Sequence, residues 1–454
     1  IENPLRLKLN YYVNDYGNSI KTLNSIPELR RWRVDSLDVY TSNKLSRDWW
    51  HYSPGIIFAL EEFKISGTVG SFASWEEFGS WYHELNRPAL DLRADMVPLE
   101  EIVGAANNRL DSIRLAYQWV QKQTRYSSIQ LGIGGWKSLP ASEVLDKGYG
   151  DCKALSTITM NILDLLGIES YYALVKAGRG RDIISEFPAS QFNHVILAVP
   201  NGKDTIWLEC TSQIIPFGQL GSFTNGKTCL IVKEEDSYLK RASNQSEVPS
   251  EYSRELHFAI NDSSANHIVI IETLKSEMME ADNLEYILWQ DREAQDRWLQ
   301  NRYAKFGDCK NHELLRIDPY TILAKYELTN DNAIRRTGNF YVLSRPDLKV
   351  LEMFEQDRFG SSSSFKIPET LTLREKIIIE GELMMIRGSM FKQLDSNFGN
   401  ITYDSSQNKN GTEINIVATI YSGDYTISDY EEFQSFLSKV RNSIQGKLVM
   451  NPKT

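Results

Sequence analysis

Cysteine is scarce in this chain: four residues in 454, at positions 152, 210, 229 and 309. Four are too few for a disulfide scaffold, and we expect Cys210, Cys229 and Cys309 to be buried free thiols. A glycine-rich phosphate loop and paired Cys-x-x-Cys or His-x-x-x-His elements are also missing. These absences argue against a nucleotide enzyme or a metalloenzyme, and we expect no cofactor and no metal.

Basic tracts and long apolar runs are missing too. The 60 acidic residues outnumber the 50 basic ones, for a formal net charge of −10, which argues against nucleic acid or an anionic membrane surface as a partner. No apolar run approaches the roughly 18 residues of a transmembrane segment. Hydrophobic residues make up 41% and charged residues 24%, as in an ordinary globular protein. At roughly 100–200 residues per domain, this length predicts about three domains.

One cysteine is distinguished by its position. The segment from Tyr149 to Gly167 reads YGDCKALSTITMNILDLLG, which places Cys152 directly after a Gly-Asp pair. Apolar residues then recur at helical spacing as far as Gly167, a typical helix stop. A thiol at a helix start lies near the positive end of the helix dipole and near unpaired N–H groups, which favour the nucleophilic thiolate. The alternative is a structural thiol, because cysteine is among the most buried residue types.

A hairpin signal downstream supplies partners for this thiol. Two alternating segments, FNHVILAV (192–199) and DTIWLEC (204–210), flank the pair Asn201-Gly202, which is typical of a two-residue turn. Such a turn would pair Pro200 with Lys203 and, six residues further along each strand, His194 with Glu209. A four-residue loop would break this register.

A carboxylate beside an imidazole fixes the ring's tautomer and supports its protonated form, as the third member of a Cys-His-acid triad does. Taken separately, a histidine on a strand and a glutamate at a strand end are more often structural or solvated. The order of Cys152, His194 and Glu209 on their predicted elements favours nucleophilic catalysis.

These segments resemble a known family. The run RYSSIQLGIGGWKSLPASEVLDKGYGDCKALS, then FNHVILAV and IWLECTS, is similar to the transglutaminase-like core of papain-type cysteine enzymes. More narrowly, it resembles bacterial secreted proteins in which that core lies between β-rich N-terminal and C-terminal domains. The matching motif is Gly-Asp-Cys at a helix start, Asn-His in a strand and an acid in the following strand.

The resemblance implies roles for individual residues: Cys152 as nucleophile, His194 as base and Glu209 as the orienting acid. Many relatives carry aspartate at the position of Glu209, and the extra methylene can still reach an imidazole. The family also implies an oxyanion donor besides the backbone N–H of Cys152. Tyr126 and Gln130 are the two candidates, and the sequence does not choose between them.

We expect an α+β multidomain protein with three parts. The sequence of residues 1–98 predicts a β-rich N-terminal domain, which we interpret as the second half of a β-sandwich whose first half is missing. Residues 99–232 predict the papain- and transglutaminase-like α+β core. Residues 233–454 predict a β-rich C-terminal domain with an inserted helical stretch from Ser276 to Lys305 and a terminal helix.

Local signals place some boundaries within these parts. Ser74 and Glu77 form a capping-box pattern before an apolar helical face, and Ser428 and Glu431 do the same for the terminal helix. The pair Asn410-Gly411 predicts a further hairpin. The chain begins with Ile1 rather than methionine, so we expect a processed or truncated product. With the bacterial resemblance, this predicts a periplasmic, secreted or cell-surface protein.

The function expected from these observations is acyl transfer through a thioester on Cys152. Attack on a peptide or amide bond followed by water would make the chain a cysteine peptidase or amidase with a protein or peptide substrate. Attack on glutamine followed by an amine would make it a protein-cross-linking acyltransferase. The third possibility is a non-catalytic protein-binding or scaffolding module at the cell surface. The sequence leaves the oligomeric state open.

Overall fold

The structure is a computed structural model, and it divides into two compact units. It describes residues 1–454 apart from 27, 38–44, 47, 130, 179, 244–249, 260–266, 276–278, 304–307, 319–320, 330–333, 355–363, 381–382, 388–391, 409–410 and 453–454. Unit 1 comprises Ile1–Val39 and Asp48–Glu247, and unit 2 comprises Tyr40–Arg47 and Val248–Thr454. Unit 1 therefore holds residues 99–232 and, apart from Tyr40–Arg47, residues 1–98, which were predicted to form separate domains. The described elements show the mixed, multidomain α+β layout that was expected.

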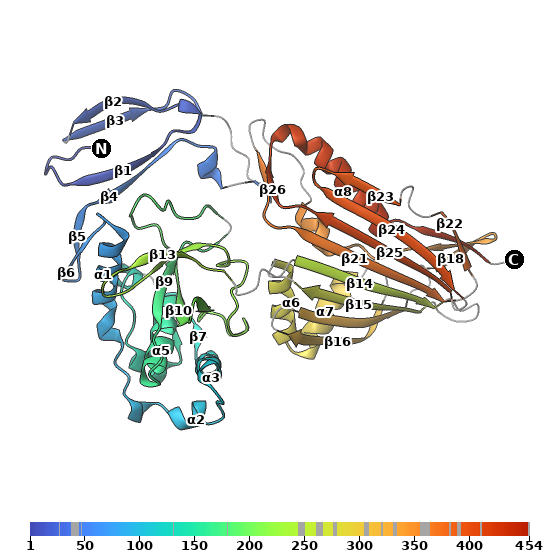
Figure 1. The fold of residues 1–454 in the computed structure, drawn as a ribbon, viewed down its shortest axis with the longest axis horizontal. Coiled ribbons are helices and arrows are strands. Elements are labelled where there is room, and N and C mark those ends of the chain that lie inside the picture. Colours follow the sequence, from blue (N-terminus) through green and yellow to red (C-terminus); the bar gives the residue numbers. More distant parts are fainter. Residues whose placement is uncertain are drawn as a thin grey trace. The chain divides into compact units, whose positions relative to one another are not determined.

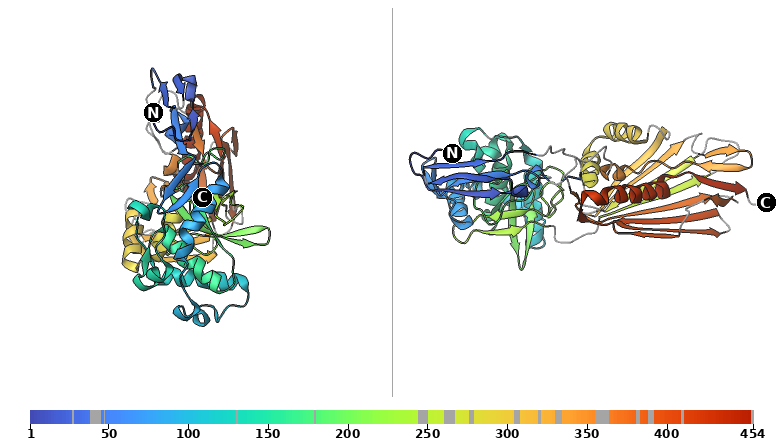
Figure 2. Two further views of the ribbon diagram at one scale, coloured as in Figure 1. Left: turned by 90° about the vertical axis from the view of Figure 1, so that its left-hand side faces the viewer. Right: turned by 90° about the horizontal axis from the view of Figure 1, so that it is seen from above.

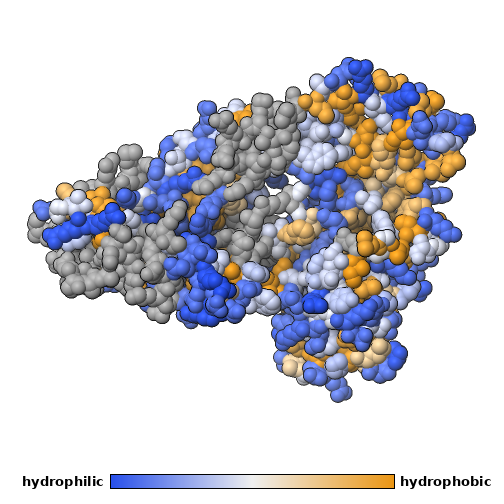
Figure 3. Space-filling view, turned by 180° about the vertical axis from the view of Figure 1, so that it is seen from behind, coloured by the Kyte–Doolittle hydropathy of each residue, from blue (hydrophilic) through white to orange (hydrophobic). Residues whose placement is uncertain are grey.

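The first part of unit 1 is built from short strands. They form three two-stranded antiparallel sheets (Figure 1): β1 (Leu9–Asn14) with β4 (Gly55–Leu60), β2 (Lys21–Ile26) with β3 (Leu29–Arg33), and β5 (Glu62–Ile65) with β6 (Thr68–Ser71). Leu23, Ile26 and Val69 on these strands are exposed, and Figure 3 shows apolar side chains gathered on one face of unit 1. The β-sandwich interpretation of this segment stays a prediction.

Helix α1 (Trp75–Asn86) begins where the sequence predicts. The Ser74 side chain accepts a hydrogen bond from the Glu77 N–H at 3.1 Å, so Ser74 caps the helix as expected. Its buried face, which includes Phe78, Tyr82 and Leu85, belongs to the same hydrophobic cluster as the helix that carries Cys152. The predicted boundary between residues 98 and 99 thus falls inside one continuous core.

The remaining helices of unit 1 surround a central one. They are α2 (Leu99–Val103), α3 (Arg109–Gln123), α4 (Ala141–Lys147) and α5 (Cys152–Leu165). Every residue of α5 from Cys152 to Leu163 is buried, so α5 is the central helix of the core. It ends before Gly167, whose φ of +70° is a left-handed conformation that glycine adopts without strain. The predicted start and stop of this helix are confirmed.

One five-stranded antiparallel sheet packs against α5 (Figure 1). Its strand order is β11 (Asp204–Leu208), β10 (His194–Asn201), β9 (Tyr171–Val175), β12 (Thr228–Ile231), β13 (Tyr238–Arg241). Side chains on one face, such as Leu174 and Leu197, join the cluster around α5, and those on the other, such as Val175 and Ile196, form a second cluster. The sheet is therefore buried on both sides, and β13 extends it beyond residue 232.

Unit 2 is organised around an eight-stranded sheet. Its order is β16 (Asp308–Asp318), β17 (Thr321–Thr329), β15 (His267–Lys275), β14 (Ser250–Ala259), β21 (Leu371–Glu380), β25 (Gly411–Ile420), β24 (Gly399–Asn408), β23 (Gln393–Ser396). Only β14 and β21 pair in parallel among these neighbours. The pairing of Asn408 with Gly411 confirms a hairpin here, but Gly411 is the first residue of β25 rather than a turn residue, and Asn410 lies outside the described residues.

Smaller sheets complete unit 2. A four-stranded sheet has the order β18 (Ile334–Thr337), β19 (Phe340–Leu343), β27 (Leu448–Pro452), β22 (Leu383–Arg387), and β20 (Phe365–Ile367) pairs with β26 (Gly423–Tyr425).

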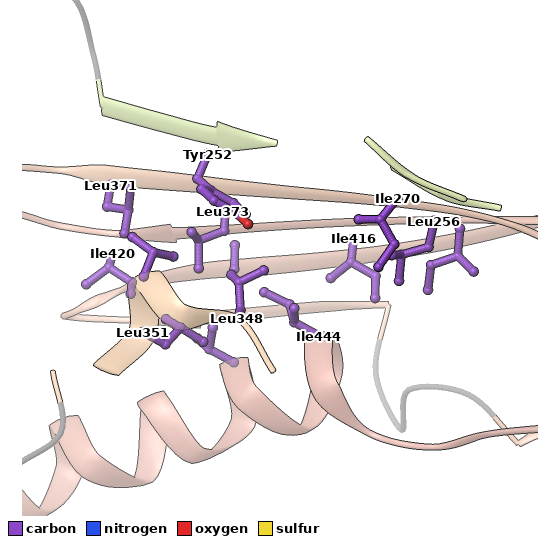
Figure 4. Close-up of a cluster of buried hydrophobic side chains, with 14 of the residues drawn as sticks. Tyr252, Leu256, Ile270, Leu348, Leu351, Leu371, Leu373, Ile416, Ile420 and Ile444 are labelled. Atoms are coloured by element: carbon purple, nitrogen blue, oxygen red, sulfur yellow. The ribbon is translucent and has the colours of Figure 1, made fainter. Parts of the chain in front are cut away.

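Helices cover one face of the large sheet. Helix α8 (Tyr430–Gln445) lies along the strands (Figure 2), and Ile444, Leu348 and Leu351 face the sheet residues Leu371 and Ile420 (Figure 4). The predicted cap of this helix is wrong: Thr426 and Asp429 form the capping box, on a short 3₁₀ turn (Ile427–Asp429) that leads into α8. A 3₁₀ turn extends the helical segment by one turn, which sequence spacing alone does not reveal.

The inserted helical stretch is two helices rather than one. Helix α6 (Met279–Trp289) and helix α7 (Arg292–Tyr303) are separated at residues 290–291. The Asp291 side chain accepts a hydrogen bond from the Ala294 N–H at 2.8 Å, so it caps α7 as a separate helix. Within the described ranges, no helix is both long enough and apolar enough to cross a bilayer.

A buried ion cluster ties this helix face to the sheet. Glu375 on β21 pairs with both Arg254 on β14 and Arg345. Arg345 also donates to the carbonyls of Ser443 at 2.9 Å and Gly446 at 2.8 Å, at the C-terminal end of α8. The guanidinium thus satisfies carbonyls that the helix end leaves without intrahelical partners.

Candidate functional site

The segment before α5 explains why Gly-Asp-Cys occurs at the helix start. A Cβ atom on Gly150 would lie 2.6 Å from the Cβ of Ala154, so only glycine allows this close approach. Asp151 is the N-cap, and its Oδ1 accepts a hydrogen bond from the Ala154 N–H at 3.0 Å. Its other oxygen pairs with the buried Lys153 ammonium. Cys152 follows as the first helical residue, with 3% of its surface exposed.

His194 is the first residue of β10, and the preceding Asn193 holds it there. The Asn193 side chain accepts a hydrogen bond from the Ala177 N–H at 2.7 Å and donates one to the Ala177 carbonyl at 3.1 Å. The Asn193 N–H also donates to the Val175 carbonyl. These bonds close the long loop between β9 and β10 and fix where the histidine emerges.

The structure brings Glu209 to His194. The Nε2 atom of His194 lies 3.0 Å from each carboxylate oxygen of Glu209. This leaves Nδ1 as the nitrogen available to the Cys152 thiol, which lines the same pocket as His194. Of the three residues predicted from the sequence, His194 and Glu209 are therefore in contact, and Cys152 lines the same pocket as His194.

The predicted register of the hairpin is wrong: each residue of β10 pairs with a residue of β11 two positions later than predicted. Asn201 pairs with Asp204, so Gly202 and Lys203 form the turn instead of Asn201 and Gly202. The positive φ of Gly202, +64°, suits the first position of such a turn. Every strand pairing shifts by two residues, and since side chains alternate with a period of two, the faces do not change. His194 and Glu209 consequently still project from the same face.

Charge stabilises this pair in the interior. Burial by itself would lower the pKa of His194, but the charge of Glu209 and hydrogen bonds with Cys152 and Glu209 raise it to about 10. Burial would raise the pKa of Glu209, whereas the charge of His194 and hydrogen bonds from His194 and Thr211 bring it below its ordinary value. The pair is therefore an imidazolium and a carboxylate at neutral pH.

Further groups hold the carboxylate and cover the ring. The Thr211 hydroxyl donates to Glu209 Oε1 at 2.5 Å, and the Thr224 hydroxyl donates to Oε2 at 3.5 Å. The ring of Phe223 meets the His194 ring edge-on, with 5.9 Å between centroids. Phe223 is 55% exposed, so it lies between the imidazole and solvent.

A pocket of about 270 Å³ opens beside the thiol. Cys152 and His194 line it together with aromatic residues from three other segments: Phe78 and Tyr82 of α1, Trp136, and Phe192. Phe78 stacks on Phe192 with centroids 6.2 Å apart and meets Trp136 edge-on at 6.3 Å. None of these aromatic residues was predicted from the sequence to belong to the site, and α1, which carries Phe78 and Tyr82, was predicted to belong to another domain.

The two oxyanion candidates have different outcomes. Tyr126 lies in β7 (Arg125–Tyr126), which pairs in parallel with β8 (Tyr149–Gly150) directly before Asp151. It is 44% exposed, which places it at the surface near the start of α5. Gln130 lies outside the described residues.

The other cysteines differ from Cys152 in their surroundings. Cys210 and Cys229 are buried free thiols, as predicted. Burial raises the pKa of Cys210 to about 12 and also raises the pKa of Cys229. Cys309 falls in β16, and its side chain lies outside the described residues. Among the residues that the structure describes, no three His, Cys, Asp or Glu side chains group as metal ligands would.

Comparison with known proteins adds evidence on the fold. No family model and no curated protein matches the chain. Among solved structures, it is similar to the crystal structure of a "putative protease" from Parabacteroides distasonis, with a TM-score of 0.58 and 11% sequence identity. The match covers 99% of this chain and 70% of that one. At this identity, the similarity shows a shared fold over nearly the whole length.

Proposed function

We propose that this chain is a transglutaminase-like cysteine peptidase or amidase in which Cys152, His194 and Glu209 act as nucleophile, base and orienting acid. The observation that carries the proposal is the hydrogen-bonded pair of His194 and Glu209, whose imidazole lines the same pocket as Cys152 at the start of α5. The resemblance of the three motifs and the name of the Parabacteroides protein agree with a peptidase-like activity.

The geometry suits acyl transfer. The reaction starts with the proton of Cys152 already on His194, whose imidazolium is bound to Glu209 through Nε2, and the Cys152 thiolate attacks an amide carbon. The C=O electron pair moves to oxygen, near the N–H groups of the first helical turn. As the C–N bond breaks, the imidazolium protonates the leaving amine, and a thioester remains on Cys152. Water, deprotonated by the now neutral His194, then releases the acid and restores the Cys152 thiolate beside the His194 imidazolium.

The test is the pH dependence of Cys152 alkylation by iodoacetamide, followed by mass spectrometry in the wild type and in His194→Ala. We expect labelling that persists well below the free-thiol pKa of about 8.5 and collapses in the variant. Cys210 and Cys229 serve as controls within the same chain, because burial raises the pKa of both thiols. Slow labelling of Cys152, or labelling that ignores His194, would remove the catalytic proposal.

Burial of the site favours one alternative, a non-catalytic protein-binding module. Cys152 is 3% exposed, and the side chains of His194 and Glu209 are 9% and 5% exposed. In such a module the triad would be closed to reagents, so labelling of Cys152 in the folded chain would match that of Cys210.

The nature of the acyl acceptor needs its own measurement. Peptides that contain glutamine are incubated with the enzyme and a biotinylated primary amine, and the products are read by mass spectrometry. Hydrolysis yields shortened or deamidated peptides without biotin, whereas a cross-linking acyltransferase attaches the amine. We expect hydrolysis.

A further inference from the structure

The helix that completes the pocket lies outside the segment that carries the family motifs. Phe78 and Tyr82 are one turn apart on α1, so their side chains share one face of the helix. Both line the pocket that Cys152 and His194 line from the other elements. The core of residues 99–232 therefore does not contain the whole site, and α1 supplies part of it.

The hydroxyl of Tyr82 is unusual among the buried tyrosines of unit 1. It is fully buried and has no hydrogen-bond partner among the described residues, while the residue as a whole is 3% exposed. The neighbouring Tyr172, whose ring meets that of Tyr82 edge-on at 5.9 Å, shares a hydrogen bond of 2.6 Å with the Thr157 hydroxyl. The Tyr117 hydroxyl donates to the carbonyls of Glu209 and Ile215. Of these three tyrosines, only Tyr82, which lines the pocket, has a hydroxyl without a hydrogen-bond partner among the described residues.

An unpaired buried hydroxyl destabilises a fold, because it loses its bonds to water without replacement. A phenylalanine at position 82 would avoid that cost with almost the same shape. Burial first, and then the charges of Tyr172, Cys152 and Asp151, raise the pKa of Tyr82. The phenol therefore keeps its proton at neutral pH, so it can act as a donor in the pocket that Cys152 also lines.

We propose that the Tyr82 hydroxyl donates a hydrogen bond to the carbonyl oxygen of the acyl group that Cys152 attacks, and that it completes the oxyanion site. This inference rests on the function proposed above. It assigns to α1 the donor that the family resemblance implied at Tyr126 or Gln130. A donor that is already buried and unpaired needs no reorganisation when charge develops on the oxygen, which is the arrangement that lowers such barriers most.

Two reagents separate this role from the activation of the thiol. With p-nitrophenyl acetate, the Cys152 thiolate forms a bond to the acetyl carbon, and the carbonyl electron pair moves to oxygen. Collapse expels p-nitrophenolate and leaves an acetyl thioester, so an oxyanion forms on the way. With iodoacetamide, the thiolate displaces iodide from a CH₂ carbon, and no oxyanion forms. A donor to the oxyanion therefore affects the first reaction and not the second.

The experiment compares Tyr82→Phe with the wild type in the full chain. We expect acylation of Cys152 by p-nitrophenyl acetate to fall at least tenfold and up to about 10²–10³-fold, the range for loss of one oxyanion donor. Alkylation by iodoacetamide keeps its rate. The denaturation midpoint stays the same or rises, because the variant removes an unpaired buried polar atom.

Two matched variants complete the design. Tyr172→Phe removes a hydroxyl that is paired in the structure, so it lowers the denaturation midpoint and leaves the ratio of acylation to alkylation rates unchanged. Tyr126→Phe tests the exposed candidate, and we expect no change in that ratio.

Three results would overturn the proposal. The first is an unchanged acylation rate in Tyr82→Phe. The second is a parallel fall of the acylation rate, the alkylation rate and the denaturation midpoint in that variant. The third is a loss of acylation in Tyr126→Phe instead of Tyr82→Phe. A wild type that is alkylated rapidly but not acylated would overturn it as well. Failure of the proposed function is distinguishable, since alkylation of Cys152 in the wild type would then be slow and independent of His194.

Discussion

Replacement of Glu209 by glutamine tests the electrostatics of the site directly. The substitution keeps the size of the side chain but removes the charge that faces His194 at 3.0 Å. Without that charge, burial is the dominant influence on the imidazole, and its pKa falls from about 10 toward or below its ordinary value of 6.5. We expect the variant to lose both stability and the dependence of that stability on pH.

The magnitude follows from proton linkage. In the wild type the folded state holds a proton on His194 that the unfolded chain releases between pH 6.5 and about 10. The stabilisation is therefore complete below pH 6.5 and lost as the pH rises through about 10, by about 1.4 kcal/mol per pH unit. At pH 8 it amounts to about 3 kcal/mol, within the range of roughly 3–5 kcal/mol for breaking a buried ion pair.

The assay is urea denaturation of the wild type and Glu209→Gln at pH 6.5, 8 and 9.5. Pulse labelling of the buried thiols Cys210 and Cys229 reports the unfolding of unit 1. The difference in unfolding free energy should shrink steadily as the pH rises. Thr211→Val, which removes a hydrogen bond to Glu209 and no charge, should keep the wild-type pH dependence. A difference between wild type and Glu209→Gln that is constant over this range would refute the reasoning.

Three further predictions concern other contacts. Phe223→Ala opens the His194 ring to water and should slow Cys152 alkylation at pH 6 with little change in stability; equal rates would contradict this. Asp151→Ala should destabilise unit 1 by about 1 kcal/mol more than Asp151→Asn, which can still cap α5, as measured by urea denaturation. Glu375→Gln leaves two buried arginines short of a carboxylate and should cost unit 2 about 3–5 kcal/mol; thermal unfolding checks it.

Local signals account for what the sequence predicted well. The start of α5 depends on Gly150, Asp151 and Cys152, which are adjacent in the chain, and its end depends on Gly167. The Ser74 cap likewise forms within four residues. Such features are determined by short-range sterics and hydrogen bonds, so neighbouring residues are enough to predict them.

The contact between His194 and Glu209 was predicted through a register that the structure corrects. The prediction survived because the shift of two residues preserves the strand faces. A shift of one residue would have turned Glu209 away from the imidazole. The turn residues Gly202 and Lys203 were not distinguishable from Asn201 and Gly202 by sequence, since a glycine in either position satisfies a two-residue turn.

By itself, the sequence determined which elements form and which residue types meet at the start of α5, because capping, alternation and helical spacing act over a few residues. Only the tertiary structure decided that α1 packs into the same core and brings Tyr82 to the pocket of Cys152. Tyr82 and Cys152 are 70 residues apart in the chain. Their meeting at one pocket depends on how apolar faces pack together, which no local pattern specifies.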